Sequence, residues 1–341
     1  MRYFTFSQRR SDVASCGSAP LSRFLPIRFA GVVVALIVSC MLIGTWTPGL
    51  AEDKVRIRFG TLPVLQALPL YVAKENGFFD QGNLSVVLIP FNTASEKDIA
   101  IAGGNLDGYF GDLATPLVIK GNGVDIKIAA VNYTTAGDRR MFGVLGKPGG
   151  PYKTVKDLAK VPVAVSSNSV IHLVTEKLLT SGGLASTNVA TLEAKNIGLR
   201  FQMLVSGQVE AATLPEPLVT AALSKGAVLL ADDAGLSESQ TVLIFTGSFL
   251  KTHPGAAKAF LNAVDKANDL INTEPDAVRG VMVNNIRLPE PLKDKYPVPR
   301  FPKLKPPERR AVEDVALWLQ GRGVIKSAIS FEEIVDEQLA R

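Results

Sequence analysis

The residues best suited to bind a small molecule are polar, small or proline residues in loops that follow predicted strands and lead into predicted helices. Three such loops in the first half of the chain supply Leu62, Pro63, Gln66, Thr93, Asp112 and Ala114. Two loops in the second half supply Ser167, Asn168, Ser169 and Glu216. Helix capping alone explains any single loop, because Ser, Thr, Asn, Asp and Pro are common where helices begin. Loops that are all expected at the carboxyl ends of strands favour a ligand cleft instead.

The loop Ser166–Ser169 gives the sharpest expectation. Three serines and one asparagine before a helix offer hydroxyl and backbone N–H donors at the positive end of the helix dipole. The pattern predicts that an anionic group of the solute binds there. Asp112 and Glu216 then face away from it or meet a cationic part of the ligand, so a zwitterion also fits. His172, one turn into the helix, could add a donor, although a structural histidine is the simpler interpretation.

Patterns for catalysis or metal binding are sparse. The chain has two histidines and two cysteines, and both cysteines, Cys16 and Cys40, lie near the amino terminus. No His, Cys, Asp and Glu residues have the spacing of a metal site, and neither a Gly-x-Ser-x-Gly motif nor a phosphate-binding loop occurs. A carboxylate pair of Asp112 and Glu216 is conceivable, but a capping or ligand-contacting acid is the simpler interpretation. The sequence predicts a protein that is not an enzyme and has no cofactor or metal.

Residues 1–51 have the layout of a secretory signal peptide. They hold five arginines and one acidic residue, and an apolar run extends from Phe29 to Trp46. Small residues at Gly49 and Ala51 suit cleavage before Glu52, which predicts export to the periplasm and a mature chain without cysteine. Two alternatives remain open. The apolar run is long enough to approach a membrane span, and Cys40 stands in a context that loosely resembles a lipoprotein processing site.

The charge of the chain is concentrated in this leader. The formal net charge is +5, and the leader alone accounts for most of it. The remaining residues are nearly neutral and predict no broad basic surface for nucleic acid.

Strand-like and helix-like stretches alternate in two series beyond residue 53, from 55 to 131 and from 161 to 231. Residues repeat as well, because Gly104–Gly108 matches Gly207–Ala211 and Pro116–Val118 matches Pro217–Val219. Similar units occur in any α/β protein, but the matched Pro-Leu-Val favours two related lobes. The series predict an α/β fold in which each lobe is an open, mostly parallel sheet flanked by helices. We expect one lobe from residues 52–137 and 244–341 and another from 138–243, with crossings near 132–141 and 238–246.

Four stretches of the chain resemble nitrate/sulfonate/taurine-type substrate-binding proteins of ABC importers, a group that also binds thiamine pyrimidine precursors. These stretches are Val55–Phe79, Gly103–Asp112, Val163–Leu179 and Met203–Pro217. The resemblance implies a type II periplasmic-binding-protein fold with a two-strand hinge. It also implies a monomer that captures a small solute between its lobes and delivers it to a membrane permease.

Carried over to this chain, the ligand loops of the family fall on nine of the ten loop residues given above, all except Gln66. The chain departs from the cysteine-rich pattern of the related pyrimidine-synthesising enzymes, since its mature part has no cysteine. Two alternatives to a transport role remain. They are an exported enzyme on the same scaffold, of pyrimidine-forming or lyase type, and a ligand-sensing module.

Overall fold

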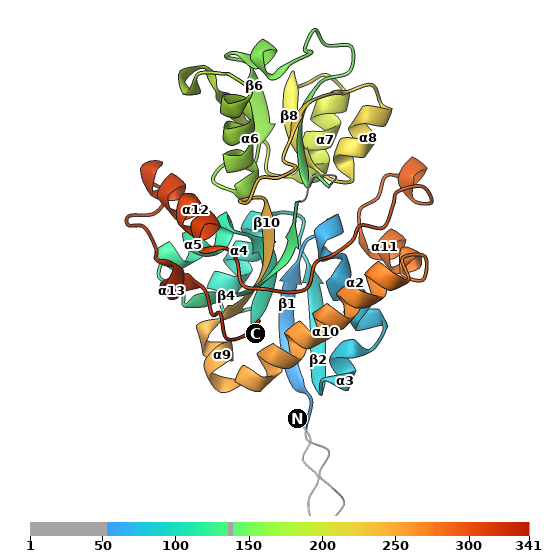
Figure 1. Ribbon diagram of the computed structural model, residues 1–341, viewed down its shortest axis with the longest axis vertical. Helices are drawn as coiled ribbons and strands as arrows, with labels where there is room; N and C mark the ends of the chain where they lie inside the picture. The colour runs from blue at the N-terminus through green and yellow to red at the C-terminus, as the bar shows by residue number, and fades with distance from the viewer. Residues whose placement is uncertain (1–52, 136–138, 341) are drawn as a thin grey trace, which may run out of the picture. The chain divides into compact units, whose positions relative to one another are not determined.

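The computed structural model describes residues 53–135 and 139–340 (Figure 1). The expectations for the leader, including cleavage before Glu52 and the state of Cys40, lie outside these residues. Within the described part, no helix is both long enough and apolar enough to span a membrane.

The first sheet has five strands in the order β2-β1-β3-β10-β4. Strand β1 pairs in parallel with β2 and β3, whereas β10 runs antiparallel to both β3 and β4. The bounds are β1 Val55–Thr61, β2 Leu84–Pro90, β3 Gly108–Asp112, β4 Ile126–Thr134 and β10 Gln240–Thr246.

The second sheet repeats this arrangement, with five strands in the order β7-β6-β8-β5-β9. Here β5 is the antiparallel strand, between β8 and β9, and the other pairs are parallel. The bounds are β5 Phe142–Gly146, β6 Pro162–Val165, β7 Ala190–Glu193, β8 Ala211–Pro215 and β9 Val228–Asp232. In each sheet the antiparallel strand is the first strand that the chain forms after it crosses from the other sheet. The predicted class, two mostly parallel α/β sheets, is confirmed.

Helices cover both faces of the first sheet, and together they form what we call the first lobe. Side chains of β10 alternate between two hydrophobic clusters, because Leu243 and Phe245 enter one and Val242 and Ile244 enter the other. The helices are α2 Leu68–Glu75, α3 Phe78–Gln81, α4 Ala94–Ala102, α5 Ala114–Gly121, α9 Gly247–Thr252, α10 Pro254–Thr273, α11 Arg279–Asn285, α12 Arg309–Gly321 and α13 Phe331–Ile334, with 3-10 turns at Leu65–Ala67 and Glu290–Leu292.

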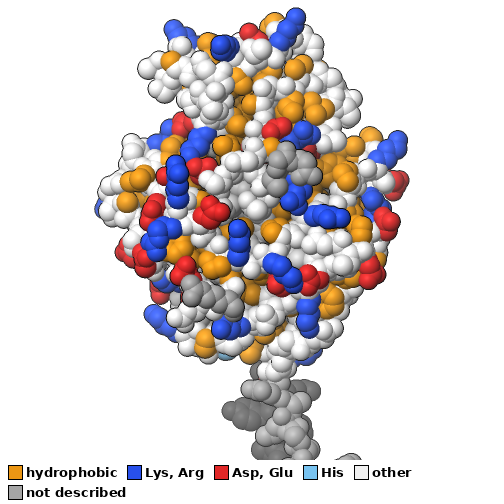
Figure 2. All heavy atoms as spheres, viewed as in Figure 1, with side chains coloured by type: hydrophobic (Ala, Val, Ile, Leu, Met, Phe, Trp, Pro, Cys, Tyr) orange, Lys and Arg blue, Asp and Glu red, His pale blue; other side chains and the backbone are white. Residues whose placement is uncertain are grey.

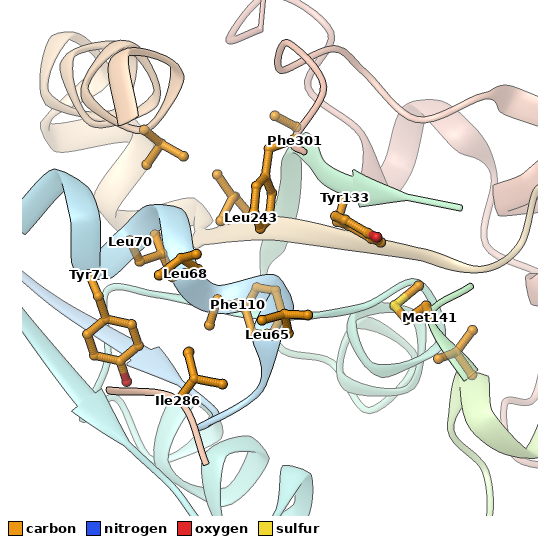
Figure 3. Packing of buried hydrophobic residues seen from close by; sticks show 14 of the residues in the cluster. Leu65, Leu68, Leu70, Tyr71, Phe110, Tyr133, Met141, Leu243, Ile286 and Phe301 are labelled. Carbon is orange, nitrogen blue, oxygen red and sulfur yellow. The ribbon is translucent and has the colours of Figure 1, made fainter. Parts of the chain in front are cut away.

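The long helix α10 packs against α2 and α3 on one side, while α12 packs against α5 on the other. The ring of Phe260 in α10 lies 4.5 Å from that of Phe59 and 4.8 Å from that of Phe79, measured between centroids. The same cluster includes Tyr133 and Met141, at the point where the chain leaves the first sheet (Figure 3).

The second lobe consists of the second sheet and the helices that pack on it (Figure 1). These are α6 Val170–Ser181, α7 Ile197–Val205 and α8 Leu218–Ser224, with 3-10 turns at Val155–Leu158 and Ser186–Asn188. The chain crosses between the sheets twice, from Thr134 to Phe142 and from Asp232 to Gln240. The second crossing lies earlier than the expected 238–246, because β10 pairs with β4 from Gln240 onward.

The sequence repeat corresponds to the repeated topology. Gly104 and Gly207 both have positive φ, at 72° and 76°, in the turns that precede β3 and β8. Both strands begin two residues later than their apolar patterns predict. Leu106 and Val209 are buried, but they fill the core from the turn rather than from the strand.

Candidate ligand cleft

Loops and strand ends from both lobes line a cavity of about 90 Å³. Most of its wall is apolar, and two aromatic rings contribute, those of Phe110 in β3 and Phe142 in β5. The polar residues at the wall are Gln66, Asp112, Ser166, Ser169, Lys195, Arg200 and Thr241. A partly open, largely apolar hollow with a few convergent polar groups is typical of a small-molecule site.

Four of the ten predicted ligand residues line this cavity, namely Leu62, Gln66, Asp112 and Ser169. Pro63 and Glu216 lie in an adjoining cavity of about 20 Å³, which shares Val64, Ile197 and Pro215 with the first.

The other four predicted residues have local structural roles. The Thr93 hydroxyl caps α4 by accepting from the backbone N–H of Glu96 at 3.2 Å, and Ala114 is fully buried where α5 begins. Ser167 and Asn168 use their backbone N–H groups within the second lobe. Ser167 donates to the Glu193 carboxylate at 2.9 Å, and Asn168 donates to Nδ1 of His172 at 3.3 Å.

The amino terminus of α6, where the sequence places an anionic group of the ligand, is occupied by a carboxylate of the protein itself. The Oδ2 atom of Asp112 accepts from the backbone N–H of Val170, the first residue of α6, at 3.3 Å. The Ser169 hydroxyl is engaged in its own loop, since it donates to the carbonyl of Ser166 at 2.8 Å. In this structure the first N–H of α6 therefore binds the carboxylate of Asp112 from the first lobe.

Glu216 is also engaged with protein groups. Its Oε1 atom lies 2.7 Å from Nε of Arg140 in an ion pair, and it accepts from the hydroxyl of Thr220 at 3.1 Å. Its other oxygen accepts from the backbone N–H of Thr220 at 3.2 Å, in the first turn of α8. These contacts place Glu216 at the start of a helix and beside the first crossing.

Arg200 is the main residue of the cavity that the sequence reasoning missed. It lies on α7, only 1% of its surface is exposed, and it lines the cavity. Its Nε donates to the Thr213 carbonyl at 2.9 Å, and Nη1 donates to the Ala194 carbonyl at 2.6 Å. Both acceptors are neutral, and no carboxylate of residues 53–135 or 139–340 forms an ion pair with it. Burial lowers the pKa of Arg200 to about 10, against the opposing effect of the Glu193 carboxylate, so the guanidinium remains cationic at neutral pH.

A sequence signal for Arg200 exists in the helical periodicity of α7. Ile197, Phe201 and Leu204 lie on one face of the helix, and Arg200 falls on this same face. A buried, charged residue in an apolar stripe requires a partner, because burial of an uncompensated charge is costly. Lys195, in the loop before α7, adds a second cation to the cavity wall.

A buried lysine lies behind the wall formed by Gly111. The Nζ atom of Lys97 is 2.9 Å from Oδ1 of Asp98 and 3.7 Å from the centroid of the Tyr109 ring. Burial lowers the pKa of Lys97. A Cβ atom on Gly111 would come within 2.9 Å of that ring, so glycine lets the cluster pack directly against the cavity wall.

The two sheets with their helices form a two-lobed α/β fold, that of periplasmic binding proteins. A family model described as NMT1/THI5 like matches residues 65–278. Because the match covers more than half of the chain, the protein belongs to this family. Within the described residues, no group of three or more His, Cys, Asp or Glu could hold a metal ion.

Solved structures with the same fold share little sequence with this chain. The alkanesulfonate-binding protein SsuA from Xanthomonas axonopodis pv. citri, bound to MOPS, is 17% identical with a TM-score of 0.71, over 84% of this chain and 99% of SsuA. The periplasmic nitrate-binding protein NrtA from Synechocystis PCC 6803 is 14% identical with a TM-score of 0.68, over 84% and 87%. DszB in complex with biphenyl-2-sulfinic acid is 16% identical with a TM-score of 0.58, over 84% and 98%. A search of curated proteins finds no match.

Proposed function

We propose that this protein is the extracytoplasmic solute-binding component of an ABC importer. It captures a small anionic or zwitterionic solute between its lobes and delivers it to a membrane permease. The fold of the sulfonate-binding and nitrate-binding proteins and a cavity lined from both lobes support this proposal. Closure of two lobes on a ligand couples binding to a shape that a permease can recognise.

The proposed negative charge of the solute is inferred from Arg200. Its guanidinium is buried at the cavity wall and has only backbone carbonyls as partners among the described residues. A carboxylate or sulfonate of a ligand would neutralise this charge and form hydrogen bonds worth about 1.5–3 kcal/mol each.

The remaining parts of the proposal concern the chain as a whole. The leader of residues 1–51 directs the protein to the periplasm and is removed before Glu52, and the mature protein acts as a monomer without nucleic acid. Lys, Arg, Asp and Glu side chains intermingle over the visible face of the described part (Figure 2), which supports a partner other than nucleic acid.

Binding without turnover is proposed in preference to catalysis. Of the described residues that line the cavity, none is a histidine or a cysteine, and Asp112 is engaged with two helix amino termini. Appearance of a product from a bound solute would favour an enzyme on this scaffold instead.

The experiment that tests this function replaces Arg200. A thermal-shift screen of alkanesulfonates, arylsulfonates, aromatic carboxylates, taurine, nitrate and pyrimidines identifies the solute that stabilises the protein most. Isothermal titration then compares wild type with Arg200→Gln. We expect affinity for that solute to fall by about tenfold to a hundredfold, because each lost charged hydrogen bond is worth about 1.5–3 kcal/mol.

Two further variants make the result interpretable. Arg200→Lys keeps the charge but not the planar fork, so it should bind more tightly than Arg200→Gln. Arg310→Gln removes a charge whose side chain is 91% exposed on α12 and should bind as wild type does. Equal affinity of a folded Arg200→Gln and the wild type for an anionic solute would contradict the proposal.

A further inference from the structure

The carboxylate of Asp112 is hydrogen-bonded to the first turns of two helices from different lobes. Its Oδ1 atom accepts from the backbone N–H and the hydroxyl of Thr115 in α5, at 2.8 and 2.9 Å. Its Oδ2 atom accepts from the backbone N–H of Val170 in α6 at 3.3 Å. Helix amino termini carry partial positive charge, so both helices stabilise a negative charge at this point. The carboxylate is therefore fixed at the cavity wall rather than free to turn away from it.

Asp112 is also the only acidic residue among the described residues that line the cavity. The two cations of the cavity, Arg200 and Lys195, come from the second lobe, whereas Asp112 comes from the first. Arg200 is buried and Asp112 is partly buried at this mostly apolar wall, so water and salt screen these two charges less than charges on an open surface.

We propose that Asp112 selects the ligand by its charge pattern, admitting a monoanion or a zwitterion and excluding a dianion. This inference rests on the proposed function, because it assigns a role within the same solute site. The anionic group of the ligand pairs with Arg200, and whatever lies toward the first lobe meets the fixed carboxylate of Asp112. A cationic group there gains an ion pair, an apolar group is tolerated, and a second anionic group is repelled.

The backbone donors of α6 lead to the same conclusion. The N–H of Val170 is already bonded to Asp112, and the N–H of Ser167 is bonded to Glu193. An anionic group that bound the N–H of Val170 would have to displace Asp112, whose other oxygen is held by Thr115. The ligand anion is thereby directed to Arg200, away from the Ser166–Ser169 loop.

Matched ligands that differ only in charge test this role. One series is benzoate, 4-(aminomethyl)benzoate and terephthalate, and the second is butyrate, 4-aminobutyrate and succinate. Each series offers a monoanion, a zwitterion and a dianion on one carbon skeleton. Isothermal titration measures all six against wild type and Asp112→Asn. Asparagine caps helices well, so the variant should keep the Thr115 contacts and its fold, which circular dichroism can verify.

We expect wild type to bind the zwitterion or monoanion at least tenfold more tightly than the dianion in the series that fits. In Asp112→Asn the affinity for the dianion should rise at least tenfold relative to that for the monoanion. The affinity for the zwitterion should fall relative to that for the monoanion. Asp157→Asn is the matched control, because Asp157 also caps a helical turn, at Thr154, but lies outside the cavity. This control should leave the ratios between the affinities for the three kinds of ligand unchanged.

The outcomes separate the two proposals. If the monoanion binds wild type but Asp112→Asn leaves the ratios between ligands unchanged, the role of Asp112 is overturned and the solute-binding function stands. If no member of either series and no solute of the thermal-shift screen binds wild type or variant, the proposed function is contradicted, and the inference that rests on it is overturned as well.

Discussion

Two deeply buried charged residues, Arg200 and Asp233, occupy different parts of the molecule. Arg200 lies at the ligand cavity, whereas Asp233 lies in the second crossing between the lobes. The Oδ1 atom of Asp233 accepts from the backbone N–H groups of Met141 and Phe142 in the first crossing, at 2.8 and 2.9 Å. One carboxylate thus ties together both segments that join the lobes.

The pH dependence of stability provides a test of this contact. Burial raises the pKa of Asp233 from 3.8 to about 6, against the opposing effect of the backbone donors. A raised pKa in the folded state means that this residue's contribution to stability is fully present below pH 4 and is lost as the pH rises through about 6. The difference between a pKa of 3.8 and one of about 6 corresponds to about 3 kcal/mol of folding free energy.

Urea unfolding of wild type and Asp233→Asn between pH 4 and pH 8 measures this contribution. We expect the unfolding free energy of wild type to fall relative to the variant by up to about 3 kcal/mol between pH 4 and 7, with a constant difference above pH 7. Asp276→Asn, at a carboxylate that is 95% exposed, is the control for loss of an acidic residue. A difference between wild type and Asp233→Asn that does not vary with pH would contradict the assignment.

At the scale of elements, helix α6 of the second lobe contacts α12 of the first through a polar cluster. The carboxylate of Glu176 accepts from Nε1 of Trp318 and from Nη1 of Arg322, each at 2.7 Å. The His172 ring lies edge-on to the Trp318 ring with centroids 5.5 Å apart, and its Nε2 atom is 3.3 Å from the Glu176 carboxylate. Burial opposes ionisation of Glu176, but hydrogen bonds with His172 and Trp318 and the charge of Arg322 together lower its pKa. His172, which the sequence offered as a donor to the ligand, belongs to this cluster.

Because the cluster joins the lobes, we expect it to favour the closed form. Trp318→Phe keeps an aromatic ring against His172 but removes the N–H donor to Glu176. The affinity for a cleft ligand should fall about tenfold or more, since a hydrogen bond to a charged group contributes about 1.5–3 kcal/mol. The radius of gyration of the ligand-free protein, from small-angle X-ray scattering, should increase.

A neighbouring residue on the same helix is the control for Trp318→Phe. Leu317 is 58% exposed on α12, and Leu317→Ala should leave both affinity and scattering unchanged. Unchanged affinity and scattering in Trp318→Phe would show that the cluster does not contribute to closure.

The elements also show why the sequence predicted the fold better than the site. Alternation and helical periodicity located most strands and helices, but they missed β5, because Phe142–Gly146 contains two glycines within five residues. This strand carries Phe142 to the cavity wall. Loop chemistry identified Leu62, Gln66, Asp112 and Ser169, since strand ends and helix starts can be read locally. The apolar stripe of α7 indicates that Arg200 is buried, but this local pattern does not show that the residue lines a cavity shared by two lobes.

At the scale of the whole molecule, the shared cavity couples the stability of the two lobes to the ligand. Its wall includes Asp112 from the first lobe and Arg200 from the second, so we expect a bound solute to contact both lobes. A ligand that binds only the folded state adds about 2.7 kcal/mol to the free energy of unfolding at 100 times its Kd. We expect the ligand to raise the free energy of unfolding of both lobes together, because unfolding of either lobe destroys the site.

Two probes of unfolding can verify this coupling. Trp318 is the sole tryptophan after residue 46, so in protein processed before Glu52 its fluorescence reports on α12 in the first lobe. Far-UV circular dichroism reports on both lobes. With the solute present, the two urea transitions should coincide and shift together, and Arg200→Gln should shift less at the same solute concentration. A transition that splits into two steps, with the fluorescence midpoint unmoved by ligand, would mean that the solute binds to the second lobe alone, and the proposed cleft would then be wrong.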